Sequence, residues 1–209
     1  LLVGDIDMTA VGTCTEVIGD RVYGFGHPFT GTGPIELPMC GGEIQGVIAN
    51  LVTSFKLGSA SQAVGTLLSD RTSGVAGRIG DVPEAAPIQW HVRYEDGSLD
   101  QEFNFRAAVH PQFTPLLASA AAYGAISATR ELPYHNTLDY SLKISFSGGH
   151  SVQLADRLVN VNPFVLFDRL GMPMSAATEN PFGRVLVKQI EGEIVIREGA
   201  ASAEILHVG

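Results

Sequence analysis

An imidazole stands at the end of an apolar strand in this sequence. His27 follows residues 21–25 and lies between Gly26 and Pro28. Glycine and proline on either side restrict the backbone, so the ring is presented in a set direction. A histidine held in this way can act as a general base. The same arrangement also suits an ordinary turn in which backbone groups satisfy the ring, and both interpretations remain open.

A histidine base needs a nucleophile within hydrogen-bond reach and a carboxylate that orients the ring. A serine nucleophile normally lies in a glycine-lined turn whose N–H groups stabilise an oxyanion, and no Gly-x-Ser-x-Gly motif exists here. The nearest substitutes are Ser59, in residues 58–61, and Ser73, in residues 72–74, although each fits a turn or a cap equally well. The acidic residues that could orient the ring are Asp5, Asp7, Asp20, Glu36, Glu43, Asp70 and Asp81.

Metal and cofactor chemistry find no support in the remaining reactive residues. The other histidines, at positions 91, 110, 135, 150 and 207, lack the spacing of a metal site. We therefore expect no cofactor and no metal centre. Cys14 and Cys40 could form a disulfide if their strands are neighbours, and two buried free thiols are the alternative.

The elements that must position these residues are mostly strands in the first half of the chain. The clearest is a hairpin whose strands flank the turn residues Gly19 and Asp20. The expected elements are strands 13–18 and 21–25, a loop at 30–38, one long strand or two over 43–55, an ambiguous segment at 59–68 and a glycine-spaced strand at 72–80.

The second half predicts strands that alternate with helices. We expect strands 88–94 and 99–109, a helix at 111–130, strands 137–146 and 151–159, a helix from Asn162-Pro163 to 177, and strands 184–197 and 203–208. From residue 99 this is the split βαβ order of a ferredoxin-like unit. The predicted fold is mainly β with an α+β C-terminal half, divided into a β-rich part at 1–98 and an α+β part at 99–209.

The amino-acid composition limits the classes of function that this chain can have. With 209 residues, of which 45% are hydrophobic and 17% charged, the chain can bury a substantial core. Its net charge of -9 is spread without runs, so nucleic acid is not an expected partner. No apolar run reaches the roughly 18 to 20 residues of a membrane span. Because the chain opens on strand-like residues without methionine, we expect a fragment or a processed product.

Several short motifs together resemble one family, the SpoIVB-type serine peptidases of the sporulation checkpoint. They also resemble the large envelope-associated bacterial proteins that carry the same domain. The resemblance covers about residues 4–80, and its sharpest part is the Gly-His pair after the hairpin. The motifs lie at residues 12–15, 23–28, 42–44, 56–58 and 74–77.

This resemblance implies a chymotrypsin-related β-barrel peptidase with a serine, a histidine and an aspartate. It assigns the general base to His27, and Asp70 is the candidate aspartate. The family's serine belongs to a Gly-Met-Ser-Gly-Ser-Pro segment that this chain lacks, and that segment could lie upstream of Leu1. Without it we expect little or no peptidase activity, because loss of a triad member costs several orders of magnitude in rate.

Two functions follow as hypotheses. The first is a peptidase domain, secreted or in the bacterial cell envelope, that acts on a protein or peptide substrate once another segment or a partner chain supplies the serine. The second is a structural or assembly module of the cell envelope, built on a peptidase scaffold and able to form a homo-oligomer.

Overall fold

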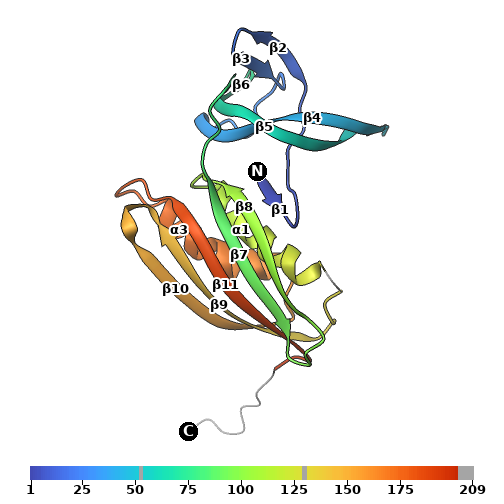
Figure 1. Cartoon of the computed structure of the whole chain (residues 1–209), viewed down its shortest axis with the longest axis vertical. Coiled ribbons are helices and arrows are strands. Elements are labelled where there is room, and N and C mark those ends of the chain that lie inside the picture. Colours follow the sequence, from blue (N-terminus) through green and yellow to red (C-terminus); the bar gives the residue numbers. More distant parts are fainter. Residues whose placement is uncertain (52–53, 129–130, 202–209) are drawn as a thin grey trace. The chain divides into compact units, whose positions relative to one another are not determined.

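The computed structural model describes residues 1–51, 54–128 and 131–201 (Figure 1). The fold is mainly β with helices in the C-terminal half, as the sequence predicts. The strands are β1 Leu2–Gly4, β2 Cys14–Ile18, β3 Arg21–Gly24, β4 Gly33–Ile48, β5 Phe55–Arg71, β6 Gly74–Ile79, β7 Ala85–Tyr94, β8 Asp100–Ala108, β9 Asn136–Phe146, β10 Ser151–Val159 and β11 Val187–Glu198. The helical segments are α1 Phe113–Ser127, the 3₁₀ turn η1 Ser147–Gly149, and a continuous run of α2 Pro163–Leu166, the π-helical turn η2 Phe167–Gly171 and α3 Met172–Thr178. The strand predicted at 203–208 lies outside the described residues.

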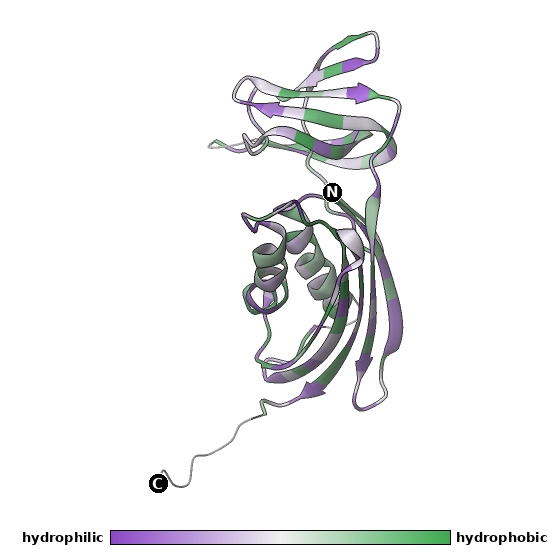
Figure 2. Cartoon of the chain, turned by 90° about the vertical axis from the view of Figure 1, so that its left-hand side faces the viewer, coloured by the Kyte–Doolittle hydropathy of each residue, from purple (hydrophilic) through white to green (hydrophobic). Residues whose placement is uncertain are grey.

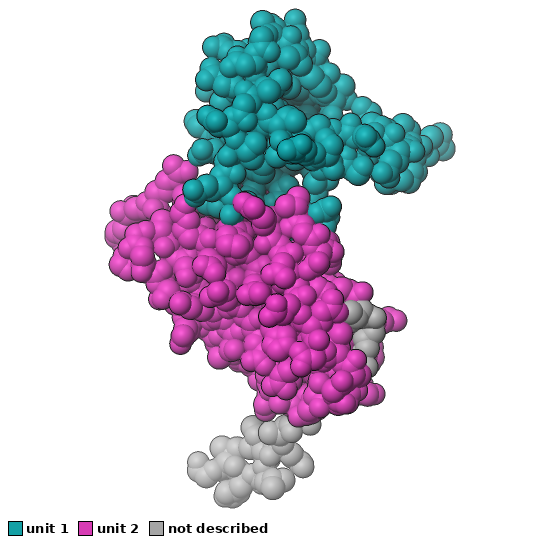
Figure 3. All heavy atoms as spheres, viewed as in Figure 1, with its two compact units in different colours: residues 1–2, 7–85, 108–110 teal, residues 3–6, 86–107, 111–209 magenta. Residues whose placement is uncertain are grey.

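The chain divides into two compact units, coloured separately in Figure 3. The first contains residues 1–2, 7–85 and 108–110. The second contains residues 3–6 and 86–107 and continues from residue 111. Strand β7 therefore belongs mainly to the second unit, whereas the sequence placed residues 88–94 in the N-terminal part.

The first unit is built on a five-stranded antiparallel sheet with the order β2-β3-β6-β5-β4. The predicted hairpin is present, because β2 pairs with β3 and Gly19 has the left-handed φ of 61° that its tight turn requires. Gly77 in β6 allows close approach to β5, since a Cβ there would lie 2.7 Å from the Thr66 carbonyl oxygen. The glycine-spaced segment at 72–80 is thus a strand, as predicted.

The prediction of a loop at 30–38 is wrong, because residues 33–38 belong to a strand. β4 begins at Gly33 and includes Pro34 and Pro38. β4 lies at the edge of the sheet, so no strand in the described part of the chain pairs with its outer side. A proline whose missing N–H group would have pointed to that side costs the sheet no hydrogen bond. The ambiguous segment at 59–68 is also strand, within β5. Register shifts along β4 bend it against β5.

The second unit has a six-stranded mixed sheet with the order β1-β8-β7-β11-β9-β10. β11 is parallel to β7 and antiparallel to β9. The helices cover one face of this sheet (Figures 1 and 2). The side chains that form the core beneath them include Trp90, Phe103, Leu117, Ile144, Leu166 and Ile194.

The second helical run begins where the sequence predicts. The Asn162 side chain accepts hydrogen bonds from the backbone N–H groups of Phe164 and Val165, at 2.9 and 3.1 Å. Pro163 occupies the first turn, where its missing N–H group costs no helical hydrogen bond. Within the described residues, no helix combines the length and the apolar character that crossing a membrane requires.

Candidate functional site

The backbone turns sharply just before His27. Phe25 and Gly26 both have positive φ values, 71° and 72°. Such a conformation is unfavourable for a bulky residue and must be held by its surroundings. The Phe25 N–H donates to the Thr13 carbonyl oxygen at 2.8 Å. Its ring fills the space above Gly12, where a Cβ would lie 1.8 Å from a ring carbon. The β2–β3 hairpin and residues 12–13 thus fix the approach to the imidazole.

The His27 ring is exposed and has one hydrogen-bond partner in the described part of the chain. Its Nδ1 lies 2.8 Å from the carbonyl oxygen of Pro28. A carbonyl oxygen only accepts, so Nδ1 donates and carries a proton. In the neutral ring Nε2 is then the acceptor, which is the tautomer that a general base needs. A carbonyl takes the place that a carboxylate has in a catalytic triad.

Asp70 is fully buried in β5 and holds the loop that follows His27. Its carboxylate accepts hydrogen bonds from the backbone N–H groups of Phe29, Thr30 and Gly31, at 2.7, 2.6 and 2.8 Å. The Thr30 hydroxyl donates a fourth, at 2.9 Å. Burial alone raises the pKa of this carboxyl, but the hydrogen bonds from Thr30, Phe29 and Gly31 outweigh it and the pKa falls below 3.8. The Asp70 carboxylate is therefore ionised at neutral pH.

The structure brings Asp70 to the His27 loop without joining it to the imidazole. All four hydrogen bonds of the carboxylate go to residues 29–31. The sequence analysis did not predict that the N–H groups of residues 29–31 bind the Asp70 carboxylate. The turn-forming composition of residues 30–33 was the available signal, and it predicted only a loop.

The two serine candidates lie in different places. Ser59 is on β5, and its hydroxyl receives a hydrogen bond from the Gln45 side chain at 3.1 Å. Ser73 lies in the turn between β5 and β6, and the neighbouring Gly74 packs against the backbone of Gly24 and Gly26. Across residues 1–51, 54–128 and 131–201, neither hydroxyl is hydrogen-bonded to His27.

Other acidic residues near His27 in sequence are engaged elsewhere. Asp20 forms an ion pair with Arg78 at 3.0 Å. Asp5 accepts a hydrogen bond from the Asn104 N–H group in the second unit, at 2.6 Å. The described residues thus do not assemble a serine, a histidine and an acid in hydrogen-bond contact.

A cavity of about 590 Å³ lies in the first unit, beside the aromatic residues of the His27 loop. Its walls are mainly apolar and include Phe25, Phe29, Leu37, Leu67 and Val75. Few polar groups reach it. No local sequence pattern predicts this cavity, because its walls come from segments far apart in the chain.

Both cysteines line the cavity. Cys14 and Cys40 are free and exposed, so neither the disulfide nor the buried thiols considered from the sequence is present. Lys56 also lines the cavity, and its Nζ donates to the Thr13 hydroxyl at 2.7 Å. This bond ties β5 to the segment that supports Phe25.

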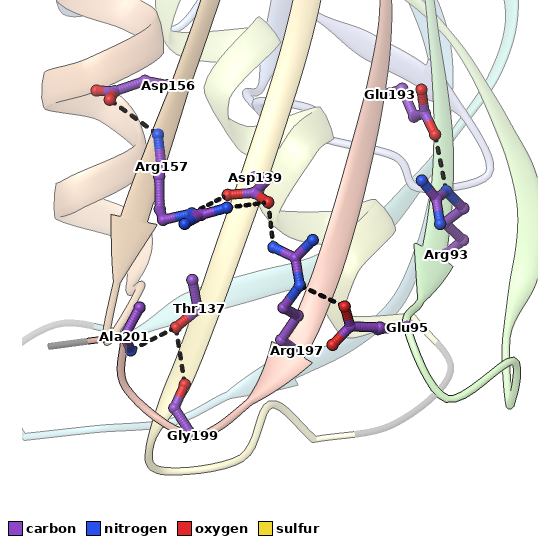
Figure 4. Close-up of polar contacts among 10 residues, drawn as sticks. All are labelled: Arg93, Glu95, Thr137, Asp139, Asp156, Arg157, Glu193, Arg197, Gly199 and Ala201. Carbon is purple, nitrogen blue, oxygen red and sulfur yellow. Dashed lines mark hydrogen bonds and ion pairs between the residues drawn. The ribbon is translucent and has the colours of Figure 1, made fainter.

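Charged residues gather on the second unit's sheet, opposite its helices (Figure 4). The Arg157 guanidinium donates to Asp139 at 2.5 and 3.0 Å, and Arg197 bridges Asp139 and Glu95. The hydrogen bonds from Arg157 and then Arg197 lower the pKa of Asp139 to about 2, although burial opposes them. The charges of Asp139, Arg157, Arg197 and Glu95 are paired with one another, so this network is better suited to stability than to proton transfer.

Comparisons with family models, with curated proteins and with solved structures found no match.

Proposed function

We propose that this chain is a SpoIVB-like serine-peptidase domain that is inactive in isolation and serves as a binding module of the bacterial cell envelope. The motifs at residues 12–15 and 23–28 support the ancestry, together with an exposed imidazole at a strand end. The antiparallel, bent sheet of the first unit suits a chymotrypsin-related barrel. A ferredoxin-like origin of residues 99–209 remains a prediction, with β7 inserted between β8 and β11 in the sheet.

The engagement of Asp70 is the observation that carries the proposal. Its carboxylate accepts four hydrogen bonds from residues 29–31, three of them at Oδ2, and it accepts none from the His27 ring. The His27 ring meets neither a carboxylate nor a serine among the described residues. A site without a nucleophile and an orienting acid loses several orders of magnitude in rate.

Binding is the function that the first unit retains. A mainly apolar cavity of about 590 Å³ with a few polar side chains in its lining is typical of sites that accept apolar groups. Its natural occupants would be apolar side chains of a protein or peptide partner.

Labelling with a fluorophosphonate probe tests the lack of activity. We expect neither labelling of the purified chain nor hydrolysis of casein, with trypsin as the positive control. His27→Ala should change nothing, and His150→Ala is the matched control. Labelling that His27→Ala abolishes and His150→Ala preserves would refute the proposal.

Titration with the apolar dye ANS tests the binding role. Ala60 is exposed and lines the cavity, so Ala60→Phe should fill part of it and weaken dye binding several-fold. Ala155→Phe places the same ring on an exposed position of β10 and should leave binding unchanged. Equal binding by both variants would contradict a role for the cavity.

A peptidase completed by another segment or chain is the second candidate. Among the described residues the Nε2 atom of His27 has no hydrogen-bond partner, and Nδ1 carries the proton. This arrangement favours the second candidate, because a serine hydroxyl could donate directly to Nε2. In this case the probe labels the natural full-length polypeptide, and His27→Ala within that polypeptide abolishes labelling. Absence of labelling in the full-length polypeptide would exclude this candidate.

A further inference from the structure

The far part of the β4–β5 hairpin has only two strands and many exposed apolar side chains. β6 pairs with residues 65–71 of β5, so residues 55–64 have β4 as their partner strand. We call residues 43–48 and 55–60 the β4–β5 arm (Figure 1). Its large apolar side chains are between 42% and 63% exposed: Ile44, Val47, Ile48, Phe55 and Leu57. A two-stranded hairpin without further packing is only marginally stable in water.

The outer edge of β4 is open to another strand. β4 ends the order β2-β3-β6-β5-β4, and no strand of the described residues pairs with its outer side. Residues 39–48 contain no proline, lysine or arginine, and Glu43 is their one charged residue. Natural edge strands are normally protected by such residues, and an unprotected edge favours pairing with a second strand.

We infer that the β4–β5 arm pairs with the same arm of a second copy of this chain. This inference rests on the proposed role as a binding module, and it names a second copy of this chain as the partner. Two identical antiparallel strands are related by a two-fold axis, so one edge can serve as its own complement. The resulting sheet would continue from one copy into the other.

Charge favours contact between two copies at this place. Each copy carries a net charge of -9, which opposes association over most of the surface. The arm contains one acid and one base, Glu43 and Lys56, and is neutral as a whole. It is therefore a part of the acidic chain where two copies can approach without strong repulsion.

The exposed area is sufficient for a specific dimer. Five half-exposed side chains of this size present about 500 Å² in each copy. Two copies together present about 1,000 Å² of this surface, which is the upper bound on what the pair can bury and equals the lower limit for a specific interface. We therefore expect a reversible dimer rather than an obligate one.

Sedimentation velocity of the purified chain, from 1 to 100 µM, tests this inference. We expect a monomer–dimer equilibrium. Val47→Glu should raise the dissociation constant at least tenfold, because it places like charges on the two facing arms. Within one copy this glutamate would face Lys56, which pairs with Val47, so the arm itself should remain folded.

Val152→Glu is the matched control. Val152 is 45% exposed on β10, the edge strand of the other sheet, and its substitution should leave the dissociation constant unchanged. Hydrogen exchange provides a second measurement. The amides of residues 43–48 that face away from β5 should be protected at 100 µM and not at 1 µM, whereas those that pair with β5 should be protected at both concentrations. Circular dichroism verifies that each variant is folded.

A monomer at 100 µM would overturn the inference, as would a dimer that resists Val47→Glu or dissociates with Val152→Glu. These results leave the proposed function intact, since that depends on the fluorophosphonate and dye experiments. Labelling that requires His27 would refute the proposed function whatever the oligomeric state.

Discussion

At the scale of single residues, one carboxylate determines how the His27 loop is held. Asp70 gathers three N–H groups and a hydroxyl from residues 29–31. Hydrogen bonds to a charged group are stronger than those between neutral groups. The imidazole itself makes a single bond to the neighbouring backbone. The position of His27 thus depends on a residue that its ring does not contact.

Asp70→Asn should release the loop. Asparagine keeps one acceptor oxygen but loses the charge and the second oxygen, so the amides of Phe29, Thr30 and Gly31 should exchange with solvent at least tenfold faster at pH 7. NMR hydrogen exchange measures this. Asp168→Asn, at an exposed position, is the control and should leave those amides unchanged. Equal exchange in the wild type and Asp70→Asn would contradict the anchoring role.

The same carboxylate predicts a pH dependence. The pKa of Asp70 is lower in the folded chain than its usual 3.8, so its stabilising effect is complete above pH 3.8 and is lost as the pH falls through the folded value. Exchange of the loop amides, corrected for intrinsic rates, should therefore accelerate in the wild type below pH 3.8. Asp70→Asn should show little such change.

Asp139 should stabilise the second unit by about 2 kcal/mol at pH 7, because Arg157 and Arg197 lower its pKa from 3.8 to about 2. This contribution is complete above pH 3.8 and disappears as the pH falls through 2. Urea unfolding followed by the fluorescence of Trp90 should show that loss in Asp139→Asn at pH 7 and a much smaller difference at pH 2.

Glu193→Gln is the control for that experiment. It breaks the more exposed pair with Arg93, and such pairs contribute at most about 1 kcal/mol. If both substitutions had the same effect at pH 7, the network around Asp139 would have no special importance.

At the scale of elements, β11 is packed so closely that it requires a glycine. A Cβ on Gly192 would lie 2.3 Å from a ring carbon of Trp90, which is only 1% exposed. Gly192→Ala should therefore displace the indole and cost about 1–3 kcal/mol. Because the chain has one tryptophan, a red shift of its fluorescence and a lower melting temperature report the change. Gly183→Ala, where a Cβ meets open space, should alter neither.

Local patterns predicted most elements of this chain. The Gly19-Asp20 turn, the Asn162 cap and the alternating apolar residues of β7 and β9 each act over a few residues, so they are visible in the sequence. The first part of β4 was missed because prolines normally interrupt strands, whereas its residues 43–48 were predicted as strand. Pro34 and Pro38 are tolerated on account of their position at a sheet edge, which is a property of the assembled sheet.

At the scale of the whole molecule, an acidic chain carries a neutral apolar arm. Salt should therefore strengthen self-association through the β4–β5 arm, because it screens repulsion between copies that each have a net charge of -9. Raising NaCl from 50 to 500 mM should lower the dissociation constant several-fold in sedimentation experiments. Salt should not restore dimer formation to Val47→Glu to the wild-type level. Weaker association in high salt would indicate an interface held by ion pairs instead.

The sequence by itself determined the β-rich character, most of the strands and both helical segments of the C-terminal half, and the imidazole at the end of the first hairpin. These depend on turn chemistry, caps and apolar periodicity, which are local. Tertiary structure alone decided that Asp70 anchors the loop after His27, that β7 joins the second sheet, and that the cavity and the open edge of β4 exist. The reason is that each of these features depends on contacts between residues tens of positions apart, and local patterns do not specify such contacts.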